Sequence, residues 1–212
     1  VILTLLTIVL VMVTTTTIHG LKNKDIETQL EDVSEQVEQY FEPYFVSEAF
    51  ISGQTSVKQI LGEMQREPSS YRFETSEYYR EALKDLERAA SISGDAVEGV
   101  WLAGVKNSEY MQSDGYVTDR SFDITGRVWY QLLQENPGYN ILTPAYEDTA
   151  TGELIVTVVT PYTDATGNLI GMIGIDLSLN ALMEYFSSIK IGETGYLMVY
   201  DYNQNVIYHP DD

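Results

Sequence analysis

Cysteine is absent from the 212 residues of this chain, and histidine occurs only twice, at His19 and His209. The first absence excludes disulfides, cysteine nucleophiles and thiolate metal sites. Neither histidine has a serine or aspartate partner at the spacing of a catalytic triad, and no metalloprotease, phosphate-loop or dinucleotide-binding motif is present. The sequence therefore predicts no enzyme, no metal site and no cofactor.

Basic residues are also scarce, with 12 Lys and Arg against 32 Asp and Glu, which gives a net charge of -20. Because so acidic a body repels phosphate backbones, we expect no nucleic-acid partner. Hydrophobic residues make up 44% of the chain and charged residues 21%, which is typical of a folded globular protein.

One long uncharged run is present, VILTLLTIVLVMVTTTTI, at residues 1–18. A membrane-spanning helix needs about 20 such residues, so we expect a truncated transmembrane helix over residues 1–20. A signal-peptide core and a buried helix are the alternatives. Since the sequence opens on Val1 and stops just after a strand-like run, we also expect a fragment of a longer chain.

Residues 21–66 have the pattern of a long helix, which we expect Pro43 to kink or split. Acidic residues lie on the face of this helix that we expect to be exposed to solvent. The apolar stripe is close to heptad spacing, so it predicts either a homodimer seam or packing on the chain's own body. The stripe contains Ile26, Leu30, Val33, Val37, Tyr40, Phe41, Tyr44 and Phe45.

Within residues 67–178 the sequence pattern changes from helical to strand-like, and turns that contain glycine separate the strand-like runs. This spacing predicts an antiparallel meander behind a helical group, and hence the α+β class. A connecting helix is expected over residues 179–190, and residues 191–212 look like the start of a second sheet. The predicted strands are residues 97–105, 140–146, 154–161 and 169–177.

The segment Phe122–Tyr130 is the strongest candidate for ligand recognition. Arg127 offers a planar fork of donors that suits a carboxylate. Trp129 and Tyr130 each add a ring with one polar tip. A structural stacking pair between Arg127 and an aromatic ring is the alternative.

Asp176 stands in an otherwise apolar strand, between Ile175 and Leu177. If side chains alternate, it faces away from those two and into a pocket, where an ammonium group would be a good partner. The alternative is that Asp176 caps the following helix.

The order of these motifs resembles the double Cache family (dCache_1), the extracytoplasmic sensor of bacterial chemoreceptors and sensor kinases. The resemblance rests on Arg127-x-Trp129-Tyr130, on Tyr146-x-Asp148 and on the run GMIGIDLS at residues 171–178. It implies a long N-terminal helix along a PAS-like antiparallel sheet module, the membrane-distal Cache module, over residues 67–178. It also implies a membrane-proximal module that starts within residues 191–212.

One subgroup of the family binds free amino acids, and the resemblance carries its roles onto this chain. Arg127 and Trp129 match the residues that hold the ligand carboxylate, and Tyr130 matches the tyrosine that follows them. Tyr146, Asp148 and Asp176 match those that receive the amino group. The subgroup's tyrosine before the arginine is replaced here by Phe122, which lacks the hydroxyl.

The resemblance therefore implies a ligand-binding sensor of a chemotaxis-type transmembrane receptor, outside the cytoplasm and held to the membrane by its N-terminal helix. A homodimer is a further expectation from the family. An amino acid is the expected small-molecule ligand. A lost hydrogen bond to a charged group costs about 1.5–3 kcal/mol of binding free energy. Because Phe122 lacks the hydroxyl, an amine, an organic acid or a purine remains an alternative ligand. An interaction domain without a small ligand is a further alternative.

Overall fold

The computed structural model describes residues 23–149, 151–191, 195–200 and 206–209. The predicted transmembrane segment, residues 1–20, lies outside these ranges. Among the helices that the structure describes, none is both long enough and apolar enough to cross a membrane.

A group of helices precedes the sheet, as the sequence predicts, but the break in the long helix lies elsewhere. Helix α1 runs through Pro43, and the split falls at Gln54, whose backbone is extended. Pro43 lies on the exposed side of α1, so water can bond the carbonyl group that the proline leaves unpaired. The group consists of α1 (Asn23–Gly53), α2 (Thr55–Arg66), the 3₁₀ turn η1 (Phe73–Thr75) and α3 (Tyr79–Ile92).

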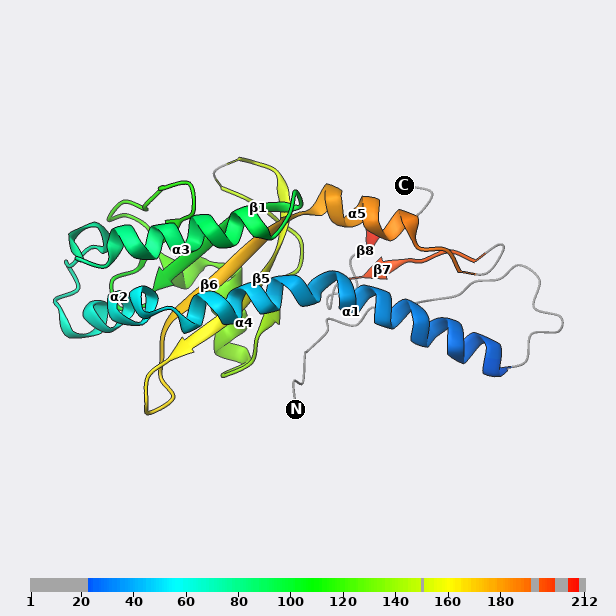
Figure 1. Ribbon diagram of the computed structural model, residues 1–212, viewed down its shortest axis with the longest axis horizontal. Helices are drawn as coiled ribbons and strands as arrows, with labels where there is room; N and C mark the ends of the chain where they lie inside the picture. Colours follow the sequence, from blue (N-terminus) through cyan, green and yellow to red (C-terminus); the bar gives the residue numbers. More distant parts are fainter. Residues whose placement is uncertain (1–22, 150, 192–194, 201–205, 210–212) are drawn as a thin grey trace.

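The apolar stripe of α1 packs on the chain's own body. Val33, Val37, Phe41 and Tyr44 are all buried in the large core cluster, which extends from one face of the sheet to residues of the C-terminal part such as Phe186. Helices α1, α2 and α3 cover this face together (Figure 1). Of the two readings of the stripe, packing within the chain is the one that the described residues support.

The sheet has six strands, and all of its pairs are antiparallel. Its order is β2-β1-β6-β5-β3, with β4 also paired to β5. The runs after residue 140 thus form the predicted antiparallel meander, since β3 and β4 pair with β5 and β5 pairs with β6, while β1 joins this meander at β6. The first strand, β1, is apolar on both faces and therefore takes a central place beside β6. The strands are β1 (Val97–Gly104), β2 (Glu109–Gln112), β3 (Ile141–Leu142), β4 (Tyr146–Glu147), β5 (Leu154–Thr163) and β6 (Leu169–Ser178).

The second face of the sheet carries a smaller core and the irregular segments. The 3₁₀ turn η2 (Ile124–Gly126) and helix α4 (Val128–Glu135) pack here, on the opposite side from α1 to α3 (Figure 1). Ile124, Trp129 and Leu133 fill this core together with Trp101 of β1. A helical layer on one face and a partly open second face confirm the predicted α+β architecture.

Strand β6 continues directly into helix α5 (Leu179–Ser188), as predicted. A two-stranded antiparallel pair follows, made of β7 (Val199–Tyr200) and β8 (Val206–Tyr208). Phe186 of α5 contacts Tyr208 of β8, with ring centroids 6.1 Å apart. The elements of residues 179–209 thus match the predicted helix and hairpin, while their assignment to a second module stays a prediction.

Candidate functional site

A cavity of about 120 Å³ lies on the second face of the sheet. A shallower hollow of about 400 Å³ adjoins it and shares Tyr116, Thr118, Phe122 and Arg127. Every predicted site residue except Tyr130 lines the cavity. The lining residues are Trp101, Tyr110, Gln112, Tyr116, Thr118, Phe122, Arg127, Trp129, Tyr146, Asp148, Thr149 and Asp176.

Asp176 forms part of the cavity floor because side chains alternate along β6. Ile175 and Leu177 are buried in the core under the helices, so Asp176 faces the other side. Both of its protein donors bond the same oxygen, Oδ1: Trp101 Nε1 donates at 2.9 Å and Thr157 Oγ1 at 2.7 Å. The helix-cap alternative is wrong, since the residue that precedes α5 in the cap position is Ser178.

The carboxyl group of Asp176 is held away from water, with 7% of the residue exposed. Burial raises its pKa to about 7, although the hydrogen bonds from Trp101 and Thr157 act in the opposite direction. Nearby Asp148 raises the pKa further. No described residue donates a hydrogen bond to Oδ2, so this oxygen is the one that a cationic group in the cavity can reach.

Trp101 supports this floor and depends on a glycine to do so. A Cβ atom at Gly174, the partner of Trp101 in the β1–β6 register, would lie 2.1 Å from the indole ring. The indole therefore lies flat across β6 with its nitrogen directed at Asp176. Its centroid is 4.9 Å from that of Trp129 and 5.3 Å from that of Tyr110, which gives the cavity an aromatic wall.

Arg127 lies between η2 and α4, where the backbone is extended at the cap position of α4. Its guanidinium carbon is 4.7 Å from the centroid of the Phe122 ring. Phe122 thus keeps the ring of the subgroup's tyrosine and uses its face to hold the cation. The two structural roles that the sequence left open for Arg127, stacking on an aromatic ring and facing a pocket, occur together.

Tyr146 and Asp148 approach the floor from β4 and the turn after it. The Tyr146 hydroxyl is 2.6 Å from Thr157 Oγ1, and because that oxygen donates its own proton to Asp176, Tyr146 is the donor. Burial raises the pKa of Tyr146, which keeps the hydroxyl protonated. Asp148 accepts hydrogen bonds from the backbone and hydroxyl groups of Thr151, at 3.2 and 2.9 Å.

Tyr130 is half-buried against the small core but is not among the cavity-lining residues. It follows Trp129 in α4, and one residue along a helix turns the side chain by about 100°. Tyr110 and Gln112, which do line the cavity, were missed by the sequence reasoning. Their alternation on one face of β2 was the available signal, and the Tyr110 hydroxyl donates to Gln112 Oε1.

The curated relatives that the chain resembles are bacterial methyl-accepting chemotaxis proteins. Methyl-accepting chemotaxis protein McpC of Bacillus subtilis is 24% identical over 212 residues, which are 100% of this chain and 31% of that protein. TlpB of the same organism is 30% identical over 128 residues, 60% of this chain and 19% of that protein. The chain thus spans less than a third of the length of either relative.

Among solved structures, the ligand-binding domain of the Pseudomonas aeruginosa amino acid chemoreceptor PctB, in complex with L-Gln, has the same fold. Its TM-score is 0.65 at 20% identity, over 91% of this chain and 69% of that one. The family model described as Cache domain (dCache_1) matches residues 15–212. Since this match extends over nearly the whole sequence, the chain belongs to the Cache domain family.

Proposed function

We propose that this chain is the ligand-binding sensor domain of a chemotaxis-type membrane receptor and that its cavity binds a free amino acid. One observation carries the proposal: a guanidinium group, on Arg127, and a buried carboxyl group, on Asp176, line the same small cavity. An amino acid is a zwitterion, so it offers a carboxylate to the first and an ammonium to the second.

The side chains around these two groups fit the same orientation. Arg127 is suited to bond the ligand carboxylate with two parallel donors, beside the indole of Trp129. The ammonium group is then directed to Oδ2 of Asp176, with Asp148 nearby. Both ion pairs gain strength because the aromatic side chains of the wall lower the local dielectric constant.

The size of the cavity supports a small ligand. Its volume of about 120 Å³ is well below the roughly 300–1,000 Å³ that is usual for drug-sized ligands. The PctB domain, which shares the fold, was solved with L-Gln bound. We therefore place the ligand in the range of single amino acids and not of peptides or larger metabolites.

The same proposal includes the setting of the domain. Residues 1–20 form a transmembrane anchor, residues 21–66 the long helical part, residues 67–178 the ligand module outside the cytoplasm, and residues 179–212 a connecting helix with the start of a membrane-proximal module. A homodimer of such chains would carry the signal. Asp176 lies three residues before α5 begins at Leu179, and α5 contacts α1 through the stacked rings of Tyr185 and Tyr40, 4.2 Å apart.

An amine without a carboxylate is the second candidate, and two features favour it. Arg127 already rests on Phe122, where the subgroup has a tyrosine hydroxyl. The buried Asp176 is surrounded by the rings of Trp101, Trp129, Tyr110 and Tyr146, and such rings also suit an organic cation.

Isothermal titration calorimetry with the twenty amino acids and a set of simple amines and organic acids tests the proposal. Amino-acid binding that is lost in both Arg127→Ala and Asp176→Asn supports it. Loss in Asp176→Asn alone assigns the cavity to amines. Arg120→Ala is the matched control, because Arg120 is exposed and does not line the cavity. Amino-acid affinity that survives Arg127→Ala would overturn the proposed orientation.

A further inference from the structure

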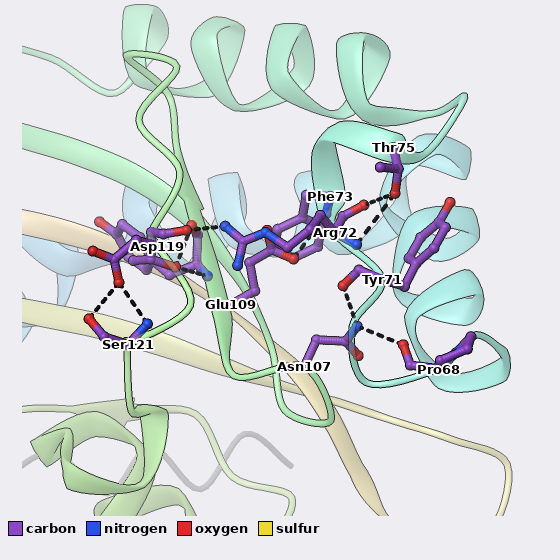
Figure 2. Close-up of polar contacts among 11 residues, drawn as sticks. Pro68, Tyr71, Arg72, Phe73, Thr75, Asn107, Glu109, Asp119 and Ser121 are labelled. Carbon is purple, nitrogen blue, oxygen red and sulfur yellow. Dashed lines mark hydrogen bonds and ion pairs between the residues drawn. The ribbon is translucent and has the colours of Figure 1, made fainter.

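Arg72 lies outside the cavity, in the connection between α2 and α3, and joins two parts of the chain that are distant in sequence. Its Nε atom is 2.7 Å from Oε1 of Glu109 on β2. A terminal nitrogen of the same guanidinium donates to the carbonyl oxygen of Thr118. Figure 2 shows Arg72 and Glu109 side by side, between the helical connection and the loop that carries Asp119.

Thr118 belongs to a segment that builds one side of the cavity, residues 113–123, which we call the wall segment. Tyr116, Thr118 and Phe122 of this segment line the cavity. Most of the wall segment is exposed, whereas Thr118 is buried, with 3% of its surface accessible. Thr118 also bonds back to Tyr110, donating from its backbone nitrogen at 3.0 Å and accepting from the Tyr110 backbone nitrogen at its hydroxyl, again at 3.0 Å.

An arginine suits this arrangement because its fork can pair with a carboxylate and donate a hydrogen bond to a carbonyl oxygen at the same time. Glu109 is fully buried, and its other carboxylate oxygen, Oε2, accepts a hydrogen bond from the backbone nitrogen of Phe73, at 2.9 Å. Burial raises the pKa of Glu109 to about 7, while Phe73 and Arg72 both act to lower it. The Arg72–Glu109 pair therefore ties the α2–α3 connection to β2 and leaves one arm of the guanidinium for the wall segment.

We propose that Arg72 is a positioning residue for the ligand cavity, which holds the wall segment in place through the Thr118 carbonyl group. Its effect on ligand affinity rests on the proposed function, but its effect on the wall segment does not. Ligand affinity thus depends on a side chain that contacts no ligand, and the α2–α3 connection is coupled to the cavity.

The decisive variant is the double substitution Arg72→Met/Glu109→Gln. Arg72→Met alone would leave the Glu109 carboxylate buried without its cation, and the chain could fail to fold for that reason. The glutamine removes this charge and keeps the acceptor for Phe73, so that only the bond to Thr118 and the ion pair are lost. Arg80→Met is the control, since Arg80 is exposed on α3 and does not line the cavity.

Two measurements on the full chain separate the role of Arg72 from the identity of the ligand. The first is amide hydrogen exchange at Gln112 and Thr118, whose backbone nitrogens bond across the hairpin to Tyr116 and Tyr110. The second is the Kd for L-glutamine, measured by calorimetry. The midpoint of urea unfolding shows separately whether the variant is folded.

We expect the double variant to unfold near the wild-type midpoint, to exchange both amides faster, and to bind L-glutamine about tenfold more weakly, the equivalent of one hydrogen bond to a charged group. The control should change neither quantity. Unchanged exchange in the folded double variant would overturn the proposal, as would faster exchange with an unchanged Kd. If wild type does not bind L-glutamine, that ligand is wrong, and the exchange data alone decide whether Arg72 holds the wall segment.

Discussion

Replacing Asp176 by Asn should stabilise the ligand-free chain at neutral and alkaline pH while it removes the affinity for an ammonium group. The pKa of Asp176 is about 7, against 3.8 for an ordinary aspartate, because the folded protein buries the carboxylate. Each pH unit of difference corresponds to about 1.4 kcal/mol, so ionised Asp176 costs the folded chain about 4 kcal/mol. The amide oxygen of Asn keeps an acceptor for Trp101 and Thr157, so the variant avoids this cost without losing those bonds.

The sign and the pH range of the effect follow from the two pKa values. Below about pH 4 the carboxyl group is protonated in both the folded and the unfolded chain, and it contributes no pH dependence. Between about pH 4 and 7 only the folded chain holds the proton, so the stability of wild type falls by about 1.4 kcal/mol per pH unit relative to the variant. Above about pH 7 the loss is complete and the difference is constant.

Urea unfolding from pH 4.5 to 8.5, followed by tryptophan fluorescence, measures this difference. Both proteins are first unfolded and refolded to remove any ligand carried through purification. The comparison cancels the titration of Glu48 and Glu109, which are present in both. A stability difference that does not grow from pH 5 to pH 7 would refute the placement of an ionisable, desolvated Asp176 in the cavity.

Ligand binding should depend on pH in the opposite direction. An ammonium group binds the ionised carboxylate, and at one pH unit below a pKa of about 7 only about a tenth of the sites are ionised. The affinity of wild type should therefore be about tenfold weaker at pH 6 than at pH 8, as calorimetry would show. Equal affinity at the two pH values would contradict an ammonium contact at Asp176.

Three further substitutions test other parts of the structure. Glu48→Gln on α1 should unfold at higher urea than wild type at pH 8, and the gain should shrink toward pH 5, because burial raises the pKa of Glu48 well above its usual range. Gly174→Ala should destabilise the chain by about 1–3 kcal/mol in urea unfolding, since its methyl group would meet the indole of Trp101, whereas Gly53→Ala, with open space around it, should not. Trp101→Phe removes a donor to Asp176, so NMR titration should show a higher pKa for that carboxyl group; an unchanged value would contradict the bond.

Patterns within single elements were sufficient to predict most of the architecture and the key acid of the site. Period-two alternation placed Asp176 opposite Ile175 and Leu177, and the structure confirms that placement. Three-to-four spacing predicted the buried stripe of α1. Both predictions need only neighbouring residues, because each side chain's direction is set by the backbone of its own element.

Relations between distant elements could not be predicted in this way. The strand order depends on which apolar strand pairs with β1, and no local pattern in the sequence shows that β6 is this strand. For the same reason the sequence pattern assigned Trp101 only to the predicted strand of residues 97–105 and gave it no role in the site. Only the register that places it opposite Gly174 turns its indole nitrogen toward Asp176. Arg72 is the same kind of case, since its partners Glu109 and Thr118 belong to a different part of the chain.

The location of the acid in β6 explains how a costly group is tolerated and why it suits a sensor. β6 is central in the sheet, with β1 and β5 on its two sides, and its other face is covered by the large core under α1 to α3. This packing holds Asp176 in place although burial opposes its ionisation. Under the proposed function, a cation bound at Asp176 relieves that opposition and stabilises the observed arrangement of β6, the strand that continues without a loop into α5. If the position of α5 relative to α1 is coupled to that arrangement, the coupling is reciprocal, and a shift of α5 changes the affinity of the cavity for the cation by the same factor.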